Sequence, residues 1–177
     1  MLNLVERYQV EVRQCSILDP AALQKAMLGM ETVIHLVGII SEVGDQTFEN
    51  LHTRATQNVV QAALISGTHR FVHMSALGTR ENARSRYHQT KWAAELAVNQ
   101  SRLDWTIFRP SLIYGPGDQF VNLFARISEW SPVLPVFARR KVVFQPVAVE
   151  EVAQCCVRAL DEPRSIRQTF DVCGPDQ

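Results

Sequence analysis

The sequence carries no excess of charge, because 18 lysine and arginine residues balance 18 aspartate and glutamate residues. A neutral chain offers no electrostatic case for a nucleic acid or an anionic membrane as partner. No apolar run approaches the roughly 20 residues that a membrane-spanning helix needs, and the first residues lack the apolar core of a signal peptide. The four cysteines form no C-x-x-C pair and no metal-ligand spacing, which predicts reduced thiols in a cytoplasm and no metal site.

Glycine is also scarce and dispersed. The eight glycines form neither a G-x-x-G-x-x-G nor a G-x-G-x-x-G run anywhere in the chain. Such a run opens a helix and directs backbone N–H groups at a pyrophosphate. The sequence therefore contains no phosphate-binding fingerprint of this kind.

Short apolar runs alternate with amphipathic segments along the whole chain. We predict strands at 10–15, 32–37, 71–75, 105–108, 142–144 and 169–172, and helices at 20–28, 48–66, 87–101, 120–128 and 149–160. Strands separated by helices predict an α/β protein with a parallel sheet. Ligands of such sheets bind beyond the carboxyl ends of the strands, so the residues that follow each strand are the first candidates for a site.

One helical turn relates Tyr87 to Lys91, so the two side chains share a helix face. We expect the ammonium of Lys91 to stabilise the phenolate and lower the pKa of Tyr87, which would let the phenol exchange a proton with a carbonyl or alcohol near neutral pH. Ser75 ends the preceding buried strand, where its hydroxyl can bond the same substrate oxygen. A Tyr–Lys pair at this spacing also occurs by chance on solvated helices, so its meaning depends on the neighbouring motifs.

Those motifs include the run W-T-I-F-R-P-S-L-I-Y-G-P-G-D at residues 105–118. Together they resemble the extended and atypical short-chain dehydrogenases/reductases, the group that holds the epimerase/dehydratase-type enzymes. Within it the chain most resembles the atypical branch related to the Rossmann-type accessory subunit of respiratory complex I. The resemblance covers nearly the whole chain. It implies a Rossmann-like doubly wound parallel sheet, with a partial dinucleotide-binding domain over 1–115 and a partial substrate-side region over 116–177.

The resemblance also implies a cofactor, NAD or NADP, and an unknown small-molecule substrate. Ser75, Tyr87 and Lys91 take the catalytic positions, and Lys91 also bonds the nicotinamide ribose. The pair Ser16 and Ile17 takes the position that holds the adenine. The other positions carried over as cofactor-binding lie after the later strands, on the ribose and nicotinamide side: Leu36, Val37, Gly38, Met74, Pro110, Ser111 and Leu112.

The chain departs from the family pattern in several places. Aligned by its motifs, it begins just before the family's third strand, so we expect it to be an internal piece of a longer protein that binds dinucleotide weakly or not at all. Ser16 stands where the family usually has Asp, and His52 stands where extended members have Asn. Ser75 is followed by Ala-Leu-Gly, whereas extended members have a run of Ser and Thr there.

Two functions remain open at this point. The first is hydride transfer at a carbonyl or alcohol, or an epimerase/dehydratase cycle that includes it. The second is a non-catalytic nucleotide-binding accessory or assembly factor of a membrane redox complex, which implies a protein partner and a place at the periphery of the inner membrane.

Overall fold

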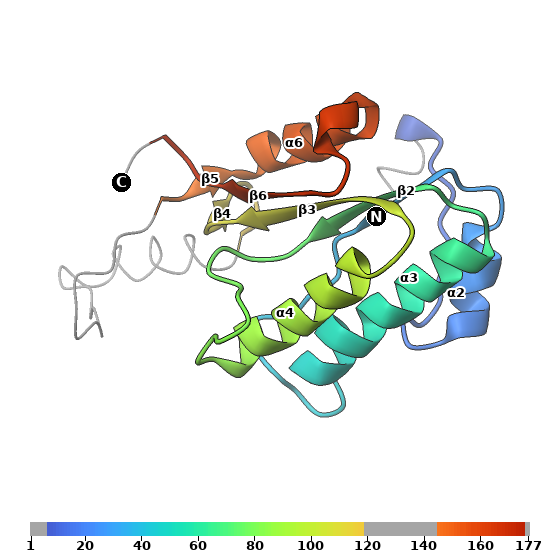
Figure 1. Cartoon of the computed structure of the whole chain (residues 1–177), viewed down its shortest axis with the longest axis horizontal. Coiled ribbons are helices and arrows are strands. Elements are labelled where there is room, and N and C mark those ends of the chain that lie inside the picture. The colour runs from blue at the N-terminus through green and yellow to red at the C-terminus, as the bar shows by residue number, and fades with distance from the viewer. Residues whose placement is uncertain (1–6, 119–144, 176–177) are drawn as a thin grey trace.

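A four-stranded, all-parallel sheet forms the centre of the computed structural model, which describes residues 7–118 and 145–175. The strands run side by side in the order β1-β2-β3-β6, namely Thr32–His35, Arg70–Met74, Asp104–Pro110 and Gln168–Val172. One face is covered by α2 (Pro20–Met27), α3 (Ala55–Ile65) and α4 (Arg86–Asn99), and the other by α6 (Val149–Asp161) (Figure 1). The predicted α/β, Rossmann-like parallel sheet with helices on both faces is confirmed.

The smaller elements border this sheet. A π-helical segment, η1 (Glu49–Arg54), leads directly into α3, and a short 3-10 turn, η2 (Pro163–Ser165), precedes β6. Strands β4 (Ile113–Tyr114) and β5 (Val147–Ala148) form a separate parallel pair that the sequence did not predict.

The predicted strand at 10–15 is wrong, because these residues form no ladder in the described chain. Val10 and Val12 are about half exposed. The guanidinium of Arg13 instead donates to the carbonyls of Lys25 and Ala26, which ties this segment to the end of α2. An alternating apolar pattern cannot form a strand without a neighbour that accepts its backbone hydrogen bonds. The predicted helix at 120–128 and strand at 142–144 lie outside the described residues.

The helix ends follow from local chemistry. Asp19 caps α2 by accepting from the amides of Ala21 and Ala22 at 3.0 and 3.1 Å, and Pro20 occupies the first helical position. Ser85 caps α4 in the same way, accepting from the amide of His88. These caps fix where α4 begins, and therefore where Tyr87 and Lys91 lie relative to the strand ends.

Two apolar clusters hold the layers together. The larger one lies under α2, α3 and α4 and is centred on Phe71, Ile107 and Val98. The smaller one lies under α6 and includes Val72, Phe108 and Cys156. Neighbouring residues of β2 alternate between the two, as the pleat of a strand requires.

Helix α4 buries two charged side chains on the same face as the apolar residues Ala94 and Val98. Lys91 and Glu95 are only 4% and 3% exposed, whereas the apolar Leu96 is 36% exposed. Charged side chains are almost never fully buried without a partner. The burial of two of them, one turn apart on the sheet side of α4, therefore points to a site rather than to packing alone.

A buried arginine joins the sheet to the end of α6. The guanidinium of Arg70 donates to the carbonyl of Ala159, to the hydroxyls of Thr106 and Ser165, and to the carbonyl of Asp104. Burial lowers the pKa of Arg70. A guanidinium satisfied on several sides fixes the position of α6 over β2 and β3.

Candidate functional site

A cavity of about 360 Å³ opens at the carboxyl ends of β1, β2 and β3. Nine of the predicted site residues line it: Leu36, Gly38, Met74, Ser75, Tyr87, Lys91, Pro110, Ser111 and Leu112. Other residues complete the lining without having been predicted: Ile39, Ile40, Ala76, Ile113 and Asp118. The predicted residues Ser16, Ile17 and Val37 do not line the cavity. The tertiary structure thus brings nine of the predicted residues together, whereas Val37 lies outside the cavity lining and Ser16 and Ile17, predicted to hold the adenine, lie elsewhere, just before α2.

Lys91 supplies the buried cation of this cavity. Its Nζ donates to the carbonyl oxygen of Met74 at 3.1 Å. Burial lowers the pKa of Lys91 to about 8, while the charge of Glu95 acts in the opposite direction. The ammonium form therefore predominates at pH 7, held at the end of β2 with further N–H donors available for a ligand.

Gly38 leaves room for this ammonium. A Cβ atom added at Gly38 would lie 2.9 Å from Nζ of Lys91. The contact is closer than side chains normally allow, so the glycine lets the loop after β1 pass directly over the lysine. This close approach draws β1 and α4 together at the cavity.

Tyr87 faces the same cavity, but its electrostatics differ from the prediction. The pKa of Tyr87 is raised by burial, whereas we predicted that Lys91 would lower it. The aromatic rings of Phe48, His52 and His88 meet the Tyr87 ring edge-on, with centroids 5.1 to 5.6 Å apart. Removal from water disfavours the phenolate. Tyr87 is consequently a protonated phenol at neutral pH, and a weaker acid than an exposed tyrosine.

The hydroxyl of Ser75 is directed away from a substrate role. It donates to Oε1 of Glu95 and lies 3.3 Å from Oγ1 of Thr79. Glu95 is in turn gripped by the guanidinium of Arg109, at 2.9 and 2.5 Å. For Ser75 to donate to a substrate oxygen, its hydroxyl would have to rotate and give up its hydrogen bond to the Glu95 carboxylate. The predicted role of Ser75 stays a prediction.

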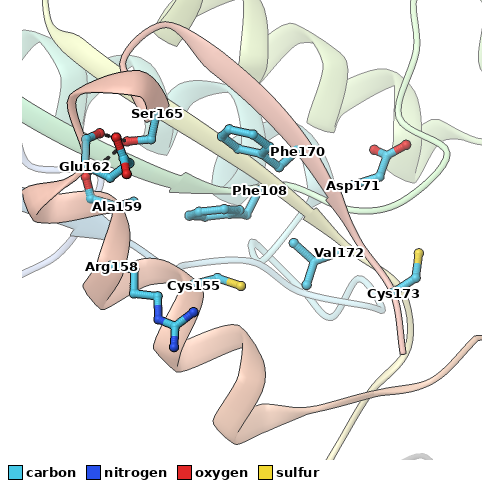
Figure 2. Close-up of a pocket in the computed structure, with 10 residues that line it drawn as sticks. All are labelled: Phe108, Cys155, Arg158, Ala159, Glu162, Ser165, Phe170, Asp171, Val172 and Cys173. Carbon is cyan, nitrogen blue, oxygen red and sulfur yellow. Dashed lines mark hydrogen bonds between the residues drawn. The ribbon is translucent and has the colours of Figure 1, made fainter. Parts of the chain in front are cut away.

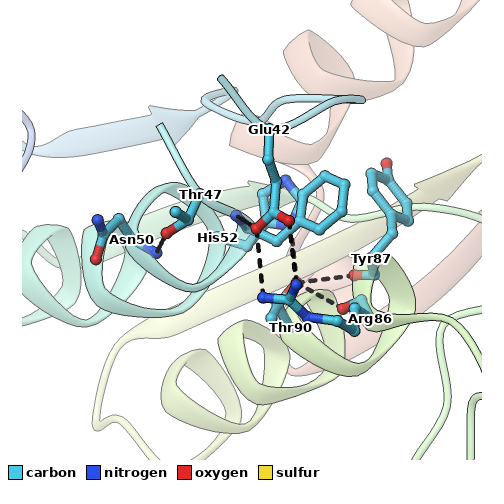
Figure 3. Close-up of polar contacts among 8 residues, drawn as sticks. Glu42, Thr47, Asn50, His52, Arg86, Tyr87 and Thr90 are labelled. Atoms are coloured by element: carbon cyan, nitrogen blue, oxygen red, sulfur yellow. Dashed lines mark hydrogen bonds and ion pairs between the residues drawn. The ribbon is translucent and has the colours of Figure 1, made fainter. Parts of the chain in front are cut away.

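His52 is the site residue whose contribution the sequence did not reveal. Only 1% of its surface is exposed, and its ring lies between the loop after β1 and helix α4 (Figure 3). Burial, together with the charge of Lys91, lowers the pKa of His52 to about 4. The only sequence signal was that His52 stands where resembled proteins have Asn.

Two further histidines are buried behind the cavity. His35 and His73 occupy paired positions of β1 and β2, and their rings stack with centroids 5.3 Å apart. His35 bonds the hydroxyl of Thr56 at 3.0 Å, and burial lowers its pKa to about 4. Burial also lowers the pKa of His73 well below its usual value. All three histidines are therefore neutral at pH 7.

A second cavity lies on the other side of the sheet. It measures about 380 Å³, lies between β6 and α6, and is bordered by the stacked rings of Phe108 and Phe170 (Figure 2). Its lining is mostly apolar, and neither Tyr87 nor Lys91 reaches it.

Within residues 7–118 and 145–175, no group of histidine, cysteine and acidic side chains is arranged to hold a metal ion. The same part of the chain has no helix both long enough and apolar enough to cross a bilayer.

Known proteins match this chain over most of its length. It is 31% identical over 159 residues to NADH dehydrogenase (ubiquinone) 1 alpha subcomplex subunit 9 of mitochondria from Mus musculus, covering 90% of the chain and 42% of that protein. It is 34% identical over 146 residues to ceramide reductase of Caulobacter vibrioides, covering 82% of the chain and 45% of the reductase. The chain therefore spans less than half the length of these curated relatives.

Solved structures share the fold. A dTDP-glucose 4,6-dehydratase from Streptomyces venezuelae, solved with NAD bound, superposes with a TM-score of 0.82 at 18% identity, over 99% of this chain and 62% of that one. A UDP-glucuronic acid 4-epimerase from Bacillus cereus, also with NAD, gives a TM-score of 0.78 at 19% identity, over 99% and 63%. The predicted likeness to epimerase/dehydratase-type short-chain dehydrogenases/reductases is confirmed at the level of the fold. Because the sequence model of the family described as NAD(P)H-binding matches residues 2–163, the chain belongs to that NAD(P)H-binding family.

Proposed function

We propose that this chain forms the nicotinamide side of an NAD- or NADP-dependent site, at which a carbonyl group is reduced or an alcohol oxidised. The observation that carries the proposal is the convergence of Tyr87 and Lys91 on one cavity at the carboxyl ends of the strands, beside Gly38. Open parallel sheets bind their ligands at this edge. Membership of the NAD(P)H-binding family supports the cofactor class.

The residues of the cavity fit the nicotinamide ribose. Lys91 is a buried ammonium with N–H groups that can donate to ribose hydroxyls, and Gly38 lets the backbone of the loop after β1 pass close to Nζ of this lysine. Apolar residues of the lining, among them Leu36, Met74 and Pro110, suit a flat ring. The sequence has no glycine-rich run for the pyrophosphate, so the fit covers only this half of a dinucleotide.

The bound cofactor would supply or accept a hydride, and the chain would supply the proton. Tyr87 is a protonated phenol at neutral pH and can donate to a carbonyl oxygen as negative charge develops there, while burial, which raises its pKa, makes it a weaker acid than an exposed tyrosine. Lys91 would fix the ribose and balance that charge. This protonation state favours reduction of a carbonyl over oxidation of an alcohol. Ser75 would add a hydrogen bond to the same oxygen only if its hydroxyl turned away from Glu95.

Binding of NADH and NADPH, followed by cofactor fluorescence, tests this assignment. We expect Lys91→Met to weaken binding by at least about tenfold, the value of a charge-assisted hydrogen bond. The matched control Lys25→Met removes an exposed lysine of α2 and is expected to change nothing. Tyr87→Phe is expected to leave binding within about twofold, since the phenol acts on the substrate, and to abolish any turnover. Equal binding by wild type and Lys91→Met would refute the assignment.

The second candidate is a nucleotide-binding accessory or assembly factor without turnover. Two observations favour it: the hydroxyl of Ser75 is bound to Glu95, and mitochondrial NADH dehydrogenase subunits are among the relatives. It would associate with a membrane redox complex at the periphery of the inner membrane, whereas the first candidate fits a cytoplasmic enzyme. Measurable cofactor binding with no turnover on panels of aldehydes, steroids and sugar nucleotides, in wild type as in Tyr87→Phe, is the result that selects it.

A further inference from the structure

The ring of His52 makes a separate contact at each of its two nitrogens. Nδ1 lies 3.0 Å from the hydroxyl oxygen of Thr90 on α4. Nε2 accepts from the amide of Ile39 at 3.2 Å and lies 3.0 Å from the carbonyl oxygen of the same residue. The ring also stacks on Phe48 and meets the face or edge of Tyr87 at right angles, with centroids 5.1 Å apart. One side chain thus contacts the loop after β1, helix α4 and the phenol. Figure 3 draws His52 together with Thr90 and Tyr87.

These contacts assign the tautomer of the ring. At Nε2 the two backbone contacts favour opposite tautomers, because the amide of Ile39 would donate to a bare Nε2 whereas its carbonyl oxygen would accept from a protonated one. The contact at Nδ1 decides between them. The hydroxyl of Thr90 donates to the helix carbonyls of Arg86 and Tyr87, each 3.0 Å away, so its oxygen accepts from Nδ1, which carries the proton in the neutral ring.

The backbone around His52 is shaped to present the ring. His52 lies within the π-helical segment η1, which widens the helix by one residue per turn and is often found at functional positions. Its neighbour Thr53 donates to the carbonyl of Thr90, so the segment is tied to α4 at two adjacent points. An exposed ion pair between Glu42 and Arg86 also links the loop to α4, but such pairs contribute at most about 1 kcal/mol.

We propose that His52 is a positioning residue, which in its Nδ1–H form holds the Gly38–Ile39 loop over the cavity and fixes the orientation of the Tyr87 ring. The contact with Ile39 sets how far the loop closes over Lys91, and the contact with Tyr87 leaves the phenol one direction in which to face. The expected effect of His52 on cofactor binding rests on the function proposed above. The position of the loop and the tautomer of the ring do not depend on that function.

Nitrogen-15 spectra of histidine-labelled protein at pH 7 test the tautomer directly. We expect the Nδ1 resonance of His52 to be of the protonated type and Nε2 of the unprotonated type. The reverse pattern, or averaging of the two resonances, would overturn the assignment. This measurement needs no ligand, so it is informative whether or not the protein binds a cofactor.

Three substitutions test the positioning. His52→Gln can place an amide oxygen near the position of Nε2 and keep the bond to Ile39, whereas His52→Asn reaches only the position of Nδ1. His35→Asn is the matched control, because it removes a buried histidine that bonds Thr56 and not the loop. The readouts are hydrogen exchange at the Ile39 amide and affinity for reduced nicotinamide mononucleotide. We expect His52→Asn to accelerate exchange about tenfold, the value of one lost hydrogen bond, and to weaken binding, while His52→Gln and the control retain wild-type values.

The outcomes separate this inference from the proposed function. Unchanged Ile39 exchange in His52→Asn would overturn the positioning role, and so would equal acceleration in His35→Asn, which would show a general loss of stability. The exchange results could be as expected while neither the wild type nor any variant binds the mononucleotide. In that case the contact between His52 and the loop stands, and the proposed cofactor site is refuted.

Discussion

Three buried neutral histidines make the stability of this chain sensitive to acid, and His35 gives the magnitude. Only 3% of His35 is exposed, and burial together with the charge of Lys91 lowers its pKa from 6.5 to about 4. Because the pKa is lower in the folded chain than in the unfolded chain, the unfolded state binds more protons between these two values. Stability is therefore complete above about pH 6.5 and is lost as the pH falls toward 4.

The size of the loss follows from the two pKa values of His35. Each pH unit between them corresponds to about 1.4 kcal/mol, so the full loss from this residue is about 3 kcal/mol. About 2 kcal/mol of it is already lost at pH 5, since most unfolded chains but few folded chains then carry the proton. His52 and His73 act in the same direction, although the three contributions are coupled and do not simply add.

Urea unfolding at pH 7.5 and pH 5.0 measures this loss. We expect His35→Asn to lose about 2 kcal/mol less than wild type over the same interval, whatever its stability at pH 7.5. His69→Asn, which replaces an exposed histidine, is the control and should retain the wild-type pH dependence. A pH dependence equal in His35→Asn and wild type to within about 0.5 kcal/mol would refute the reasoning from burial.

Three further substitutions test other parts of the structure by urea unfolding and mononucleotide titration. Arg70→Met should lower the free energy of unfolding by about 3 kcal/mol or more, because several buried acceptors lose their donor. Arg164→Met, which replaces an exposed arginine, should change it by less than about 0.5 kcal/mol. Equal effects of the two substitutions would contradict the role of Arg70. Gly38→Ala should weaken binding of reduced nicotinamide mononucleotide at least about fivefold, because the added methyl group displaces the Lys91 ammonium. It should lower the free energy of unfolding by less than about 1 kcal/mol. Unchanged binding would contradict the close approach of Gly38 to the lysine. Lys91→Met should raise stability at pH 7 by about 1–3 kcal/mol, because a buried charge is removed, and a loss of stability would show that the ammonium is net stabilising.

Much of the fold could be predicted because it is encoded locally. Asp19 followed by Pro20 marks the start of α2, and the apolar run at 71–74 marks β2, without knowledge of any distant residue. The strand predicted at 10–15 failed because its alternation is only half of what a strand needs. The other half is a partner ladder, and a pattern along one segment contains no information about its neighbour.

The site was predictable in position but not in electrostatics. The convergence of Tyr87, Lys91 and the strand ends follows from topology alone, because parallel strands place their carboxyl ends at one edge. The direction in which the pKa of Tyr87 shifts did not follow from the sequence. It depends on burial of the phenol by the rings of Phe48, His52 and His88, and the sequence does not show that these rings surround Tyr87. Likewise the hydrogen bond between Ser75 and Glu95 joins residues 20 positions apart, and no spacing in the sequence predicts it.

The π-helical segment Glu49–Arg54 is equivalent to a helix with one surplus residue. Each residue of a regular α-helix advances about 100° around the axis. Deleting a single residue before His52 in this segment would therefore let the helix return to its regular winding, and the imidazole would turn by a part of the roughly 100° that one residue spans. A one-codon deletion is thus a larger change to this cavity than most substitutions, since it would withdraw the ring from Ile39, Thr90 and Tyr87 in one step while leaving the downstream helix α3 in register.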